Sequence, residues 1–142
     1  MDTQAAPVPA PIIGFDFNQF EDAPCGEFSV RHPQTGAPTS MVIVLVGPEH
    51  PTAKRLVHER QRRMRAEMAR LGKMPVVDPQ QDEEDQLERA CACTLGWRGA
   101  AVSYSADAAR AAYSDPKRRW LLDQVLAALD ERERFISPSA NP

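Results

Sequence analysis

The chain of 142 residues has 17 lysines and arginines against 20 aspartates and glutamates, giving a net charge of −3, and 42% of its residues are hydrophobic. This composition is ordinary for a soluble domain with a modest core, and the slight acidity excludes a chain whose whole surface coats nucleic acid. The longest apolar run, Met41 to Val46, is far shorter than the roughly 20 residues of a membrane-spanning helix, so we expect no membrane association.

Residues 1–24 are predicted to be a flexible, Pro/Ala-rich arm, because four prolines prevent helix formation and few other residues can be buried. Phe15, Phe17 and Phe20 are the exception within this arm. They pack either on the protein's own surface or on a partner. The first residues also lack the basic and continuous apolar segments of a signal peptide, so we expect a cytoplasmic protein.

A single globular domain is predicted over 25–136, and it begins with a β-hairpin at 27–47. The segment EFSVRH alternates apolar and polar residues as a half-buried strand does, and PQTGAPTS has turn chemistry. The run MVIVLV is rich in β-branched residues, which predicts a strand covered on both faces. An unpaired edge of this hairpin is available to a second copy, so we expect self-association.

Four helices are predicted after the hairpin, followed by a short tail at 137–142. Gly72 and Pro75 end the first helix, Ser105 caps the third, and Asp115 with Pro116 begins the fourth. The predicted helical ranges are about 52–71, 82–95, 106–114 and 116–135. The expected fold class is therefore α+β, mainly α, with an N-terminal hairpin followed by about four helices.

The first predicted helix carries a thin apolar stripe that includes Met64 and Met68, beside the cations Arg62, Arg63 and Arg65. Eight basic and two acidic residues between positions 54 and 73 give a local charge of +6, and six acids follow between 78 and 88. The favoured interpretation is that the basic helix lies beside the acidic helix and is neutralised by it. The alternative is that the charged faces recruit a charged partner.

Gly96 and Trp97 follow the second predicted helix. The sequence predicts that Gly96 is the left-handed residue that ends this helix and that Trp97 packs against its last turn as a core anchor. Gly99 completes this corner, and Asp115 and Pro116 fix the start of the last helix. Trp120 is compatible either with the core or with a partner surface.

The common catalytic motifs are absent from the sequence, which favours a protein without enzymatic activity, catalytic residues or cofactor. Cys25, Cys91 and Cys93 are interpreted as reduced thiols, since they are odd in number in a chain without a secretory signal. The pair Cys91 and Cys93 could join Cys25 or a histidine around zinc. Their spacing fits no established zinc template, and we expect no metal site.

Several segments, taken in their order along the chain, resemble the tail assembly chaperones and small minor tail proteins of long-tailed bacteriophages. The segments are RHPQTGAPTS, VGPEHP, AKRLVHERQRRMR, the Gly-Trp-Arg-Gly corner and AAYSDP. The resemblance covers roughly residues 26–136, and the arm before it is longer than in the family. It implies a protein of the bacterial host cytoplasm that binds the tape measure protein and helps to recruit tail tube subunits.

Two alternatives stay open at this point. One is a structural tail or connector protein that resides in the virion. The other is a nucleic-acid-binding accessory protein that uses the basic helix 54–73, although the acidic block that follows makes nucleic acid the less favoured partner.

Overall fold

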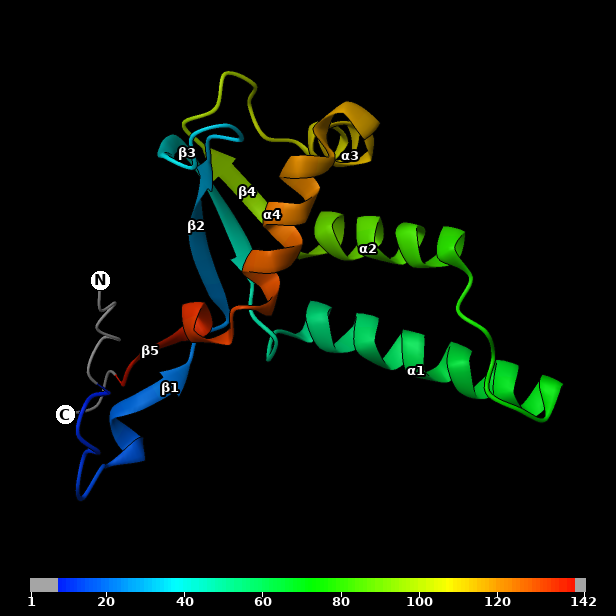
Figure 1. The fold of residues 1–142 in the computed structure, drawn as a ribbon, viewed down its shortest axis with the longest axis horizontal. Helices are drawn as coiled ribbons and strands as arrows, with labels where there is room; N and C mark the ends of the chain where they lie inside the picture. Colours follow the sequence, from blue (N-terminus) through cyan, green and yellow to red (C-terminus); the bar gives the residue numbers. More distant parts are fainter. Residues whose placement is uncertain (1–7, 140–142) are drawn as a thin grey trace, which may run out of the picture.

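The computed structural model describes residues 8–139, which form an α+β fold with four α-helices and two small antiparallel sheets (Figure 1). The strands are β1 (Phe20–Asp22), β2 (Cys25–Arg31), β3 (Pro38–Val46), β4 (Thr94–Arg98) and β5 (Ile136–Pro138). The α-helices are α1 (Pro51–Leu71), α2 (Pro79–Cys93), α3 (Ala106–Ser114) and α4 (Arg119–Asp130). Three short 3-10 turns are η1 (Phe17–Gln19), η2 (Pro116–Arg118) and η3 (Arg132–Phe135). None of the helices among the described residues is long and apolar enough to cross a bilayer.

The predicted hairpin is part of a three-stranded sheet of order β2-β3-β4. The third strand, β4, comes from the segment expected to end the second helix. It pairs antiparallel with β3, so that Ile43 lies opposite both Phe28 of β2 and Trp97 of β4. The hairpin therefore gains its third strand from a segment more than 40 residues further along the chain.

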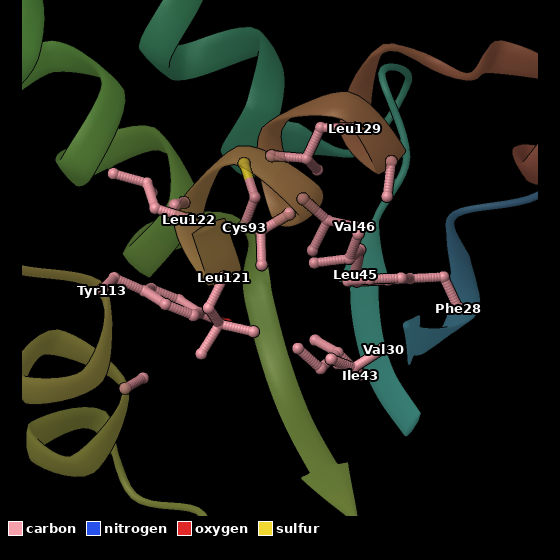
Figure 2. Close-up of a cluster of buried hydrophobic side chains, with 14 of the residues drawn as sticks. Phe28, Val30, Ile43, Leu45, Val46, Cys93, Tyr113, Leu121, Leu122 and Leu129 are labelled. Carbon is pink, nitrogen blue, oxygen red and sulfur yellow. The ribbon is translucent and has the colours of Figure 1, made fainter. Parts of the chain in front are cut away.

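The core lies between the sheet and the helices α2, α3 and α4 (Figure 2). Ile43 and Leu45 of β3 and Val125 of α4 are completely buried there. The other apolar residues buried in this core are Phe28, Val30, Val46, Ala90, Cys93, Ala109, Tyr113, Leu121, Leu122, Ala128, Leu129 and Phe135. A single hydrophobic cluster thus joins β2 and β3 to the helices α2, α3 and α4 and to η3.

The opposite face of the sheet is only half-covered, so the prediction that β3 is buried on both faces is wrong. Val42 and Val44 alternate with the buried Ile43 and Leu45 and keep part of their surface exposed. On this face Arg98 forms a two-pronged ion pair with Glu27, with N–O distances of 2.9 and 3.0 Å. This hydrogen bonding lowers the pKa of Glu27 below its usual value. An antiparallel sheet with helices on one side tolerates such a solvated second face.

The edge of β2 is capped by side chains, which corrects the expectation of an unpaired hairpin edge. Gln124 of α4 accepts a hydrogen bond from the backbone N–H of Arg31 and donates one to its carbonyl, both at 2.9 Å. Arg134 donates to the carbonyl of Glu27 at 3.0 Å. The side chains of Gln124 and Arg134 thus bind backbone groups of β2 with which a strand from a second copy would otherwise form hydrogen bonds.

The segments predicted as an arm and a tail are joined by pairing of β1 with β5, in which Phe20 lies opposite Pro138. The backbone N–H of Ala23 donates to the carbonyl of Phe135 at 2.6 Å, and that of Ser139 donates to Gln19 at 2.7 Å. The arm is therefore fixed to the body from Phe20 onward, while residues 1–7 and 140–142 lie outside the described residues.

Helix α2 begins earlier than predicted, because the side chain of Asp78 accepts from the N–H of Gln80 and Pro79 occupies the first helical position. The last predicted helix is divided into η2, α4 and η3, so only residues 119–130 are α-helical. Helix α3 covers the range 106–114 that the sequence predicts, and Ser105 caps it by accepting from Ala108 at 2.9 Å.

Tyr113 is buried in the core, where its hydroxyl lies 2.9 Å from Thr94 Oγ1. Burial raises the pKa of Tyr113 from 10.0 to about 12, since the phenolate is poorly solvated there. The folded protein consequently keeps a proton that the unfolded chain releases above pH 10. We expect the free energy of unfolding to fall by about 1.4 kcal/mol per pH unit between pH 10 and 12. Urea unfolding at pH 9, 10, 11 and 12 measures this slope.

A Tyr113→Phe variant is the control for this pH dependence. It lacks the titrating hydroxyl, while Thr94 keeps its bond to the carbonyl of Ala90 at 2.7 Å. Its stability should decline less steeply above pH 10 than that of the parent chain. Equal slopes for the two proteins would contradict the assignment to Tyr113.

Candidate functional site

Helices α1 and α2 form a hairpin that projects from the body of the protein (Figure 1). Helix α1 runs outward from the end of β3, and α2 returns toward β4. His50 caps the start of α1 by accepting from Thr52 N–H at 3.1 Å, and Gly72 ends it in the left-handed conformation at φ 71°. No residue of α1 is buried; only Ala53 and Leu56, near its base, pack against the core. Helix α1 therefore offers most of its surface to other molecules.

A row of apolar residues on α1 is exposed. The exposed fractions are 54% for Val57, 38% for both Met64 and Met68, and 41% for Leu71. With Gln61 these residues occupy positions 57, 61, 64, 68 and 71, the alternating spacing of three and four that forms one face of a coiled-coil helix. We call these five residues the α1 seam.

The basic helix α1 lies beside the acidic helix α2, as predicted. Only one cation of α1 pairs with an acid of α2, so the expected neutralisation of one helix by the other is wrong. Arg63 contacts Asp85 at 3.0 Å. Lys54, Arg55 and Arg70 instead pair with acids of α1 itself or of the turn before it. Those partners are Glu49, Glu59 and Glu67. Among residues 8–139, Arg60, Arg62, Arg65 and Lys73 have no carboxylate within 4.0 Å.

Two further acids of α2, Glu88 and Asp82, have partners outside α1. Glu88 pairs with Arg110 of α3 at 2.9 Å, while Asp82 accepts a hydrogen bond from Gln86 within α2. Arg89, also on α2, pairs with Asp130 of α4 at 2.9 Å. The charged surface of α2 thus fixes the hairpin to the body, and much of the positive charge of α1 stays at the surface.

A groove of about 490 Å³ lies at the base of the hairpin. Its apolar lining includes Val46, Pro48, Leu56, Val57, Cys93 and Leu129. Charged side chains of both signs, among them Arg60 and Asp82, also line it. The groove shares Val57 with the α1 seam, so the two surfaces are continuous.

The N-terminal segment that carries the three phenylalanines leads into β1, and the β1–β5 sheet lies away from the tip of α1 (Figure 1). The rings of Phe15 and Phe20 stack with their centres 6.1 Å apart. Phe17 is 75% exposed, and the neighbouring Ile12 and Ile13 are also largely exposed. The predicted partner-binding residues therefore fall into separate places, with the aromatic group far from Met64, Met68 and the arginines of α1.

The Gly96–Trp97 corner is a strand rather than a helix end, so the predicted left-handed role of Gly96 is wrong. Helix α2 ends at Cys93, and Gly99 is the residue of this corner with positive φ, at 74°. The indole N–H of Trp97 donates to the carbonyl of Val102 at 2.8 Å, and its ring meets Tyr104 edge-on at 5.1 Å. Trp97 is half-buried against the core, as an anchor of the loop that follows β4.

The remaining predicted residues lie around the start of α4. The side chain of Asp115 accepts from Lys117 N–H at 3.0 Å, and Pro116 is the first residue of η2. Trp120 is 38% exposed, whereas its neighbours Leu121 and Leu122 are buried. Asp115 and Pro116 thus act as a start signal for a turn, and Trp120 adds an aromatic surface to α4.

The three cysteines carry free thiols. Burial raises the pKa of the Cys93 and Cys91 thiols above the usual value. Residues 8–139 hold no group of three or more histidine, cysteine or acidic side chains that could bind a metal ion. His32 and His50 accept hydrogen bonds from backbone N–H groups of a turn and of a helix start, respectively.

Sequence reasoning missed two features of these surfaces. It did not recognise the regular alternation that includes Gln61, because that residue interrupts the apolar stripe. It also did not detect that Gln124 and Arg134 cap the β2 edge, since a contact over 93 residues leaves no local signal. Comparison of the chain with protein-family profiles, curated proteins and solved structures gives no match.

Proposed function

We propose that this chain is a non-enzymatic tail assembly chaperone of a long-tailed bacteriophage. It binds the tape measure protein and assists the recruitment of tail tube subunits, in the cytoplasm of the host bacterium. The proposal starts from the resemblance of residues 26–136 to this family and from the surfaces described above.

The observation that carries the proposal is the exposure of α1. A helix of 21 residues without a buried residue contributes little to the stability of its own domain. Its apolar side chains are nevertheless exposed in a row, and methionines, which make up part of that row, adapt easily to different partner surfaces. These properties are typical of a surface that holds a helix of another chain.

The phenylalanine segment supports a second contact of the same kind. Phe15, Phe17 and Phe20 are exposed. They belong to the segment that forms or precedes β1, which lies away from the tip of α1 (Figure 1). Two separate apolar surfaces allow one chain to bridge two others, as recruitment of tube subunits to a tape measure protein requires.

Co-expression with the tape measure protein of the same phage tests the function. We expect most of the tape measure protein to be soluble and to copurify with this chain, and to be insoluble when the chain is omitted. A Gln34→Ala variant, altered in an exposed turn of the body, serves as a control that should retain the effect. Unchanged solubility of the tape measure protein would contradict the proposal.

A nucleic-acid-binding accessory protein is the second candidate, favoured by the three arginines of α1, Arg60, Arg62 and Arg65, that have no carboxylate partner in the described part of the chain. Salt-sensitive retention of duplex DNA that is lost in an Arg62→Glu/Arg63→Glu/Arg65→Glu variant would support it. Recovery of the chain in purified particles would instead support a structural tail or connector protein of the virion.

A further inference from the structure

The α1 seam has the spacing of a coiled-coil face without a partner in the described structure. If Val57, Met64 and Leu71 are assigned to heptad position d, Gln61 and Met68 fall at position a. A polar residue at one a position is a common device for fixing the register of a coiled coil. The seam therefore has both the apolar residues and the register element of a helix-binding face.

Helix α2 occupies a neighbouring face of α1 and leaves the seam accessible. Arg63, which contacts Asp85 of α2, lies about 100° around the helix from Met64. All four apolar residues of the seam retain at least 38% of their surface in the presence of α2. A further helix can thus lie along the seam and form a three-helix arrangement with α1 and α2.

The charges beside the seam decide which helix fits. Arg65 occupies a flanking e position on the side away from α2, and Arg60 occupies a flanking g position; among the described residues neither has a carboxylate within 4.0 Å. Glu67, at the next g position, is already paired with Arg70. In a symmetric antiparallel pair of α1 helices centred on Met64, the e positions of the two copies face each other, so Arg65 of one copy would lie across from Arg65 of the other. Such like-charge contacts are unfavourable, which argues against a second copy and for an acidic partner.

We propose that the α1 seam binds an amphipathic helix of another chain, whose apolar residues follow the heptad spacing and whose flanking positions are acidic. This inference rests on the proposed function, since it names the chemistry of the segment that such a chaperone would hold. The apolar contacts supply most of the affinity, and the acidic flanks select this helix over neutral or basic ones.

Two designed peptides of four heptads test the proposal, both with leucine at positions a and d. One has glutamate at every e and g position, and the other has lysine there. In titration of the full chain, followed by calorimetry at low salt, the acidic peptide should bind at least about tenfold more tightly than the basic one. The preference should shrink when the salt concentration is raised, because exposed charges are then screened.

A matched pair of variants locates the contact. Met64→Glu places a carboxylate in the seam and should weaken binding of the acidic peptide by about tenfold or more. Ala66→Glu makes the same charge change at an exposed position about 160° away around the helix, and should change the affinity less than about threefold. Circular dichroism of both variants checks that the fold is kept.

Three results would overturn the proposal. They are equal affinity for the two peptides, equal effects of Met64→Glu and Ala66→Glu, and binding of a duplex DNA that displaces the acidic peptide. The co-expression experiment is independent of these measurements. A chain that binds the acidic peptide and leaves the tape measure protein insoluble would refute the function while supporting the seam.

Discussion

Replacement of Phe135 by alanine is expected to lower the free energy of unfolding by about 3–5 kcal/mol. The Phe135 side chain is completely buried, where η3 meets β2 and the end of β3. Its ring lies so close to Gly26 and Gly47 that a Cβ on either glycine would come within 3.2 Å of it. The cavity left by alanine is framed by backbone and cannot collapse easily, so both the lost burial and the empty space contribute to the cost.

Urea unfolding at neutral pH measures this effect, with Phe17→Ala as the control. Phe17 is the same residue type in a largely exposed setting, so its replacement should change stability by less than about 0.5 kcal/mol. The backbone carbonyl of Phe135 accepts from Ala23. Alanine keeps this carbonyl but removes the ring that anchors it in place, so proteolysis near β1 should become faster in Phe135→Ala. A loss below about 1 kcal/mol would contradict the role of the ring as an anchor.

Replacement of Gly99 by alanine is expected to cost about 3 kcal/mol or more. Gly99 has φ 74°, and a Cβ built on it would lie 1.9 Å from the carbonyl oxygen of Ser40. The two residues are further joined by the hydroxyl of Ser40, which donates to the Gly99 carbonyl at 2.8 Å. The side chain of alanine therefore forces the turn after β4 away from the start of β3, in addition to the strain of the backbone conformation.

Gly36→Ala separates these two contributions. Gly36 has the same φ of 74°, but a Cβ there meets no atom within 4 Å. Its replacement should cost only the conformational strain, about 1–2 kcal/mol. Thermal unfolding of both variants provides the comparison, and equal losses would show that the close approach of Ser40 does not matter.

Capping residues, glycine and proline correctly predicted the helix and turn boundaries that they form through contacts close in sequence. Gly72 ends α1, Ser105 starts α3, and Asp115 with Pro116 opens the turn that leads into α4. The start of α2 carries the same Asp-Pro signal, at residues 78 and 79, and could have been predicted from it. The sequence interpretation instead placed the start within the run of acids, which also favours the first turn of a helix.

The Gly96–Trp97 segment could not be predicted from local signals, because tertiary pairing decides its conformation. A glycine after an apolar helix is a reasonable helix end. Here the free edge of β3 and the aromatic partner Tyr104 stabilise an extended strand instead. Strand preference depends strongly on such neighbours, whereas a helix cap depends on residues close in sequence.

The candidate surfaces were partly predictable. Exposed Met64 and Met68 follow from the narrow apolar stripe of α1, since a stripe of that width cannot cover a large core. The partners of the charges did not follow from the sequence, because they depend on how the helices are rotated. Arg63 forms an ion pair with α2, while Arg62 and Arg65, one and two residues away in the chain, do not.

Pairing of β1 with β5 brings the beginning and the end of the described chain together, on the side of the molecule away from the tip of α1 (Figure 1). A fluorescent label attached within β1 or β5 is thereby held at a distance from the tip of the helical hairpin, so it can report on this end of the molecule while leaving α1 free to bind.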